Sequence, residues 1–232
     1  YKYYKRLSDE HRAIILRGNH TQMLIDFLKG EDCQFNFVHN GLNKTLDSFL
    51  GDTNSWHTFM FYITDCDDQD VVVDIYGDRV IPLLGKYNSS IPTEVYFDVY
   101  QEYAREKINE YFPELLPWLE SLPYYYETKN YIFTHAAIDG KCEDWRNPTY
   151  TRYSDWTPWQ YLTWDDGSFF NEEIKNTDKT VVVGHFYTDA IREKFGIEVT
   201  GTNEILKADD GRKGTHDGIG THDVRLPRSA AW

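Results

Sequence analysis

The chain has few cysteines, a deficit of positive charge and no long apolar run. Its three cysteines, Cys33, Cys66 and Cys142, are too few and too scattered for a disulfide framework or a zinc ribbon. Lys and Arg total 24 against 38 Asp and Glu, so the net charge is −14. A nucleic-acid polymer is therefore disfavoured as a partner, because a phosphate backbone requires a basic face. No run approaches the roughly 18 apolar residues of a membrane helix, and no signal-peptide pattern is visible. We expect a cytoplasmic protein with no membrane partner.

The content of apolar and aromatic residues is sufficient for a folded core. Apolar residues make up 41% of the 232 residues and aromatic residues 16%, which argues against wholesale disorder. This length suits one domain of moderate size or two small ones. The chain begins with Tyr1 rather than Met, so we expect a fragment, a processed chain or a trimmed chain.

Three short apolar runs are each followed by a histidine beside a small residue. The first run is 13–16, followed by Arg17-Gly18-Asn19-His20 and a helix predicted over 21–29 with Thr21 as its cap. The second is Tyr131-Ile132-Phe133, which leads to Thr134-His135-Ala136 and pairs with a predicted strand at 124–126. The third is 179–183, which leads to Gly184-His185. Each run is predicted to be a strand of an α/β sheet, in which the carboxyl ends of strands gather sites.

The stretch from about 40 to 120 is predicted to be mainly helical. Apolar residues recur at helical spacing over 42–50 and over 95–112. Near the end of the chain, Asp209-Asp210-Gly211 is a hairpin-turn signal after Ile205 and Leu206. Residues 214–232 are rich in glycine and lack periodicity, so an irregular tail is expected there. Its two Thr-His-Asp repeats could bind a metal, or the tail could carry no site.

Asn19, His135 and His185 are candidate ligands of a divalent metal. Neutral imidazole and carboxamide oxygen both bind such ions. The three strand ends can meet in space although they are remote in sequence. The alternative is that each histidine is a hydrogen-bonded structural residue. Both interpretations remain open from the pattern alone.

The three blocks together resemble the calcineurin-like metallophosphoesterases. The Arg17–His20 block after Ile-Ile-Leu is similar to that family's GNH block. The region Leu122-Pro123 through His135-Ala136 is similar to its LP…HAG region, and Val183-Gly184-His185 resembles its VGH block. The resemblance covers roughly residues 11–211. It is strongest to the PPP-type serine/threonine protein phosphatases, including bacterial and phage members and the related symmetrical diadenosine tetraphosphatases.

The resemblance implies a four-layer αββα sandwich and a two-metal centre, with manganese first and iron or zinc as alternatives. Asn19, His135 and His185 would bind one metal, and a metal-bound hydroxide would attack phosphorus. His20 would be the general acid. Arg17 would hold the loop or the phosphate, or would be a structural arginine.

Two blocks of the family pattern, GDxHG and GDxxDRG, are absent before the GNH block. Only one metal therefore has a near-complete ligand set, and the sandwich is expected to be incomplete at its N-terminus. A phosphate-binding arginine is also missing after Trp164, where Asp166 stands. Arg146 or Arg152 could take that role, or could be surface charge.

We therefore expect a partial metallophosphoesterase domain over 1–213, with a helical insertion around 40–120 and a tail over 214–232. The expected function is metal-dependent hydrolysis of phosphomonoesters, with a phosphorylated protein or a small nucleotide-type phosphoester as substrate. The alternatives are a truncated or non-catalytic module that binds one metal or a partner, and a single-metal protein unrelated to phosphatases. Little activity is expected from these 232 residues alone.

Overall fold

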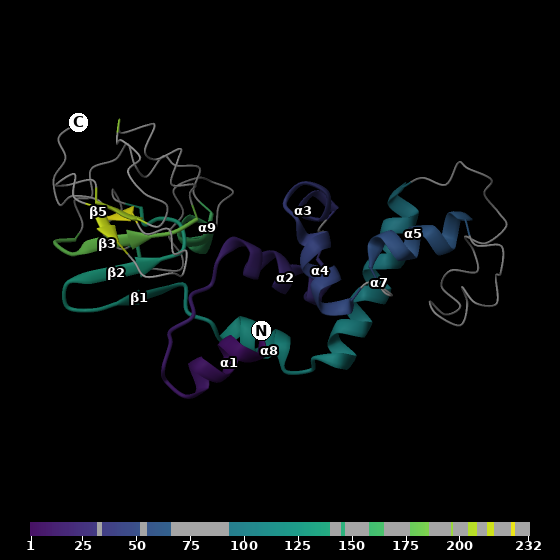
Figure 1. Cartoon of the computed structure of the whole chain (residues 1–232), viewed down its shortest axis with the longest axis horizontal. Coiled ribbons are helices and arrows are strands. Elements are labelled where there is room, and N and C mark those ends of the chain that lie inside the picture. The colour runs from purple at the N-terminus through teal and green to yellow at the C-terminus, as the bar shows by residue number, and fades with distance from the viewer. Residues whose placement is uncertain are drawn as a thin grey trace. The chain divides into compact units, whose positions relative to one another are not determined.

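A computed structural model describes residues 1–31, 34–51, 55–65, 93–139, 145–146, 158–164, 177–185, 196, 204–207, 213–215 and 224–225 (Figure 1). The chain divides into two compact units. Unit 1 consists of Tyr1–Asn19 together with Ser121–Trp232, and unit 2 is His20–Glu120.

Unit 1 is built around a mixed sheet whose strands are short. The strands are β1 (Tyr125–Glu127), β2 (Tyr131–Thr134), β3 (Thr180–Val183), β4 (Glu204–Lys207), β5 (Lys213–Thr215) and β6 (Val224–Arg225). They lie in the order β1-β2-β3-β6-β4-β5. The strands β1 and β2 are antiparallel, whereas β2 and β3 are parallel. The strands predicted at 124–126, 131–133 and 179–183 are thus confirmed.

The β1–β2 hairpin has one buried face and one half-exposed face. Alternate side chains of a strand point to opposite faces. Ile132 and Thr134 on one face are 0% and 4% exposed, whereas Tyr126 and Tyr131 on the other are 42% and 37% exposed. Tyr126 lies directly opposite Phe133 in the register, so these two side chains share the exposed face.

The C-terminal segments also contribute to this sheet. Strands β4 and β5 pair antiparallel, as the hairpin signal predicts, whereas Asp209-Asp210-Gly211 lies outside the described residues. Strand β6 pairs with both β3 and β4. The expectation of a wholly irregular tail over 214–232 therefore needs correction at the two short segments that form strand pairs.

The helix α1 (Lys2–Asp9) ends in a Schellman motif. The Arg12 N–H donates to Leu7 O at 2.9 Å and the His11 N–H donates to Ser8 O at 3.0 Å. His11 occupies the left-handed position that glycine usually fills, with φ 55°. This turn directs the chain out of the helix into the apolar run 13–16.

The strand predicted over 13–16 is wrong, because these residues are not in a strand of the sheet. Figure 1 draws them as a purple coil after α1. A β-branched apolar run favours extended backbone, but a strand also requires a neighbouring strand that satisfies its hydrogen bonds. No described segment supplies that pairing for residues 13–16.

The described residues of unit 2 are mainly helical, and the helices predicted over 42–50 and 95–112 are confirmed. The helices of this unit are α2 (Asn19–Lys29, whose first residue belongs to unit 1), α3 (Gln34–His39), α4 (Leu42–Leu50), α5 (Trp56–Asp65), α7 (Thr93–Tyr111) and α8 (Leu115–Ser121, whose last residue belongs to unit 1). The helix α2 begins before Thr21, so Thr21 lies inside the helix and is not its cap.

The core of unit 2 is largely aromatic. Phe37 contacts Trp56, Phe97 and Tyr100 edge-to-face, with ring centroids 4.9–6.0 Å apart. Phe59 is fully buried beside Tyr100. Edge-to-face pairs stabilise by about 0.5–1.5 kcal/mol each beyond their burial. Among the described residues, no helix combines the length and apolarity needed to cross a bilayer.

The described residues therefore form a mixed α/β protein. All of the described strands belong to one sheet, so a second sheet of an αββα sandwich is not among them. The predictions on Cys33, Cys66, Cys142, Arg152, Asp166 and the tail histidines lie outside the described residues.

Candidate metal centre

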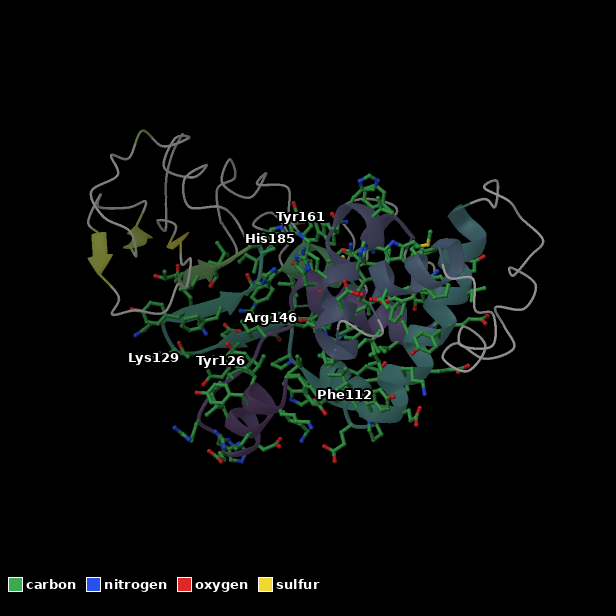
Figure 2. All side chains as sticks on the ribbon, turned by 45° about the vertical axis from the view of Figure 1, so that its right-hand side comes forward. Phe112, Tyr126, Lys129, Arg146, Tyr161 and His185 are labelled. Carbon is green, nitrogen blue, oxygen red and sulfur yellow. The ribbon has the colours of Figure 1, made fainter. Side chains whose placement is uncertain are left out.

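His135 and His185 follow the carboxyl ends of two adjacent parallel strands. Thr134 at the end of β2 lies opposite Val183 at the end of β3. The Gly184 N–H then donates to His135 O at 2.9 Å, which keeps the two chain segments together beyond the strands. In Figure 2, His185 lies at one end of the sheet and Lys129, in the β1–β2 turn, lies at the other. The sequence prediction that the two strand ends converge is thus confirmed.

Asn19 is brought to the same place by the loop that precedes α2. The Arg17 N–H donates to Pro123 O at 2.8 Å, which ties the loop to the segment leading into β1. Asn19 is 6% exposed, so its side chain is held away from solvent.

Three potential ligand atoms converge. Asn19 Oδ1 lies 2.8 Å from His135 Nε2, and His185 Nδ1 lies 3.2 Å from the same nitrogen. The imidazole rings of the two histidines have centroids 5.0 Å apart and are inclined at 68°. Asn19 Oδ1 and His185 Nδ1 are thus both close neighbours of His135 Nε2.

These separations fit a common metal ion. Ligand atoms bound about 2.1 Å from one ion at roughly right angles lie about 3 Å apart. The donor set, two imidazoles and one carboxamide oxygen, suits the divalent ions Mn²⁺, Fe²⁺ and Zn²⁺. The same distances also fit hydrogen bonds in which His135 Nε2–H is shared between Asn19 Oδ1 and His185 Nδ1. The two arrangements differ in the tautomer of His135, because metal binding through Nε2 requires the proton of the neutral ring to be on Nδ1.

Gly18 leaves room for the His135 ring because glycine has no side chain. A Cβ at Gly18 would lie 2.9 Å from both Cε1 and Nδ1 of His135. Such atoms in ordinary contact are about 3.5–4.0 Å apart. The backbone of Gly18 lies outside the left-handed region, so the requirement for glycine comes from the ring and not from φ. Sequence reasoning placed a small residue here but missed this contact.

His185 has an unusual backbone conformation. Its φ is 68°, in the left-handed region that costs a non-glycine residue roughly 1–2 kcal/mol. Such strain persists only when the surroundings enforce it, and it gathers at functional sites. Trp164, in the segment after α9 (Pro158–Thr163), has its ring 6.5 Å from the His185 ring. The Ala136 N–H donates to Leu162 O in α9 at 2.8 Å, so this helix is anchored beside the β2 end.

Arg17 is buried and engaged with Tyr124. Its NH1 donates to the Tyr124 hydroxyl at 2.7 Å, and its Cζ lies 4.4 Å from the centre of that ring. Only 8% of Arg17 is exposed. These contacts suit the predicted loop-holding role. A direct phosphate contact by Arg17 stays a prediction. Sequence reasoning missed Tyr124 as the partner, and its place directly after Pro123 gave no signal of the contact.

His20 is the exposed second residue of α2 and belongs to unit 2. It directly follows Asn19 in the chain. The general-acid role of His20 stays a prediction.

Arg146 takes part in an ion-pair cluster elsewhere in unit 1. Its guanidinium makes a bidentate contact with the Glu127 carboxylate at 2.6 and 2.8 Å, and Lys179 Nζ donates to the same carboxylate at 2.6 Å. These contacts hold the pKa of Glu127 down at about 2, with the Arg146 hydrogen bond as the largest cause and the Lys179 hydrogen bond adding to it against desolvation. Glu127 lies opposite Ile132, and Lys179 precedes β3, so the cluster is at the opposite ends of β2 and β3 from His135 and His185. The suggestion that Arg146 binds the phosphate at the metal site is therefore wrong.

The ligand set remains small. Within the described ranges, no three or more His, Cys, Asp and Glu side chains are grouped to hold a metal. The candidate centre reaches three ligands only because Asn19 contributes its carboxamide oxygen.

Comparisons with known proteins add no relative. No family model matches the chain, and neither a curated protein nor a solved structure matches it.

Proposed function

We propose that the chain binds one divalent metal ion through Asn19, His135 and His185, and that this ion serves the hydrolysis of phosphomonoesters. The observation that carries the proposal is the convergence of Asn19 Oδ1 and His185 Nδ1 on His135 Nε2 at 2.8 and 3.2 Å. Mn²⁺ is the first candidate, with iron or zinc as alternatives. We further propose that the α/β unit belongs to a four-layer metallophosphoesterase fold.

A three-ligand site leaves coordination positions open, and open positions are typical of catalytic metals, because structural sites are closed by protein ligands. A divalent cation supplies positive charge that polarises a phosphoryl oxygen and makes water a better nucleophile at neutral pH.

The chain's own residues have separate tasks in this proposal. Gly18 leaves room for the His135 ring, and the Gly184–His135 hydrogen bond keeps the ends of β2 and β3 together. The contact of Arg17 with Tyr124 keeps the Asn19 loop in place. His20 would donate a proton to the oxygen that leaves phosphorus. A phosphorylated protein or a small phosphoester is the proposed substrate class.

A second candidate function is a module that binds one metal without turnover. It is favoured by the single set of ligands and by the placement of Arg146 at the far ends of the strands, where it binds Glu127. Both candidates share the metal site and differ only in catalysis.

Metal content and p-nitrophenyl phosphate hydrolysis should be measured together on the full chain after loading with Mn²⁺. The variant His135→Ala removes a proposed ligand. The variant His57→Ala is the matched control, because His57 is an exposed histidine in unit 2. Metal binding and turnover that are lost in His135→Ala but kept in His57→Ala would support the hydrolase. Metal bound without turnover would support the non-catalytic module, and no bound metal would exclude both.

A further inference from the structure

The helix α9 and the residue that follows it contact both chain segments that carry the histidines of the candidate centre. Within the helix, Leu162 O accepts the Ala136 N–H at 2.8 Å, directly after His135. The next residue after the helix, Trp164, has its ring centroid 6.5 Å from that of His185, and the two rings are inclined at 56°. One short helix thus connects the segments that follow β2 and β3.

The position of Trp164 is set by a helix end that is itself buried. Residues 161–163 are all buried. The Trp164 N–H donates to Gln160 O at 2.6 Å, which continues the helical hydrogen-bond pattern by one residue. In Figure 2, Tyr161 and His185 lie at the same end of the sheet. Trp164 is therefore held on a fixed support beside the end of the sheet that carries the histidines.

The orientation of His185 depends on contacts with its neighbours. Its φ of 68° is a left-handed conformation, which persists in a non-glycine residue only where the surrounding structure enforces it. The centroid of its ring lies 5.0 Å from that of His135 and 6.5 Å from that of Trp164. Both distances are within the range of about 4.5–7 Å that is typical of aromatic pairs. Trp164 is thus an aromatic neighbour of His185 that is not itself a proposed ligand.

We propose that Trp164 is a positioning residue of the candidate metal centre, an inference that rests on the proposed function. Its indole ring restricts rotation of the His185 imidazole and keeps Nδ1 beside His135 Nε2, where the two nitrogens are 3.2 Å apart. Residues that orient a metal ligand typically contribute about 10- to 100-fold to metal affinity. The reason is that a side chain that rotates freely must lose this freedom when the ion binds.

The alternative is that Trp164 only stabilises the fold through its apolar surface. The two roles differ in what they require of His185. A positioning role acts through the imidazole and disappears when the imidazole is removed, whereas a general contribution to the fold remains. Mn²⁺ affinity measured with and without the His185 ring therefore separates the two roles.

The test measures Mn²⁺ binding to the metal-free full chain by electron paramagnetic resonance, in which the signal of the free ion falls as the ion binds. The variant Trp164→Leu removes the aromatic ring but keeps an apolar side chain, and circular dichroism checks that each variant is folded. We expect Mn²⁺ affinity to be about tenfold lower in Trp164→Leu. Trp164→Phe restores a ring and should bind within about threefold of the unmodified chain.

Trp118→Leu is the matched control, because Trp118 is also half-buried but lies in α8 of unit 2. Its Mn²⁺ affinity should equal that of the unmodified chain. In a His185→Ala chain, Trp164→Leu should cause no further loss of affinity, because no imidazole remains to be oriented.

An equal loss with and without the His185 ring would show a purely structural role of Trp164 and would overturn the proposal. Unchanged affinity in Trp164→Leu would also overturn it, as would a loss in Trp164→Phe as large as that in Trp164→Leu. No Mn²⁺ binding by the unmodified chain would overturn the proposed function, and this inference with it. Binding by the unmodified chain that is indifferent to Trp164 would overturn the inference alone.

Discussion

Gly18→Ala tests whether the position of the His135 ring matters for metal binding. The new Cβ would lie 2.9 Å from Cε1 and Nδ1 of His135 and 3.0 Å from Cγ. Restoring ordinary contact of about 3.5–4.0 Å requires the ring to retreat by about 0.5–1 Å. Metal–ligand distances tolerate only about 0.2 Å, so the displaced Nε2 can no longer share an ion with Asn19 Oδ1.

The expected loss of Mn²⁺ affinity is about 10- to 100-fold, which corresponds to about 1.4–2.8 kcal/mol of binding free energy. The free energy of unfolding without metal should also fall by about 1–3 kcal/mol, because a methyl group is forced into a filled space. The loss of chain entropy in the unfolded state on Gly→Ala acts in the opposite direction by about 0.4–1 kcal/mol, so the net change is a modest destabilisation.

A double-mutant cycle with His135→Ala isolates the contact. Without the imidazole, Gly18→Ala has nothing to displace, so its cost in urea denaturation should disappear, with a coupling energy of about 0.5–3 kcal/mol. An equal cost in both backgrounds would refute the steric account. Unchanged Mn²⁺ affinity in Gly18→Ala alone would refute the link between ring position and metal binding.

Three further outcomes follow from the structure. His185→Gly should have a free energy of unfolding about 1–2 kcal/mol higher than that of His185→Ala in urea denaturation, because φ 68° strains alanine but not glycine. Both variants should lose Mn²⁺ affinity equally. Equal free energies of unfolding would contradict the strain. Glu127→Gln should lower the free energy of unfolding by about 1–2 kcal/mol at pH 7, less than the full pKa shift because the Glu127 side chain is 22% exposed. Since the pKa of Glu127 is lowered from 4.5 to about 2, this stabilisation is complete above 4.5 and is lost as pH falls through about 2, so the two urea curves should merge in acid; a constant difference down to that pH would argue against the ion pair. Tyr124→Phe should lower the free energy of unfolding by about 1–2 kcal/mol, because it removes the hydroxyl that accepts from Arg17 NH1. An unchanged melting temperature in thermal denaturation would contradict the loop-holding role of Arg17.

Sequence patterns predicted the parts of the site that local preference determines. The runs 131–133 and 179–183 are apolar or β-branched and have neighbours in one sheet, so they became β2 and β3 with a histidine after each. Parallel pairing then placed His135 beside His185, as carboxyl ends of adjacent strands require. Helical spacing over 42–50 and 95–112 likewise predicted α4 and α7, because it creates one apolar face.

The run 13–16 shows where local preference is insufficient. Its residues resemble those of β3, but strand pairing is a property of two segments, and no described segment pairs with this one. Sequence alone could not reveal the missing neighbour.

Contacts between residues remote in the chain were also beyond the sequence. The cluster of Glu127, Arg146 and Lys179 and the contact of Gly18 with His135 depend on how the strands are registered. Arg146 was a candidate for the phosphate because it lies near Trp164 in the sequence, and a lone arginine gave no signal that its partner was a carboxylate at the far end of the sheet.

The most direct measurement of the metal site is isothermal titration calorimetry of the metal-free full chain with Mn²⁺. We expect one ion per chain, with binding weakened at least tenfold in Asn19→Ala, His135→Ala and His185→Ala and unchanged in His57→Ala. Binding that survives all three ligand substitutions, or no binding by the unmodified chain, would contradict the proposal that these side chains share one ion.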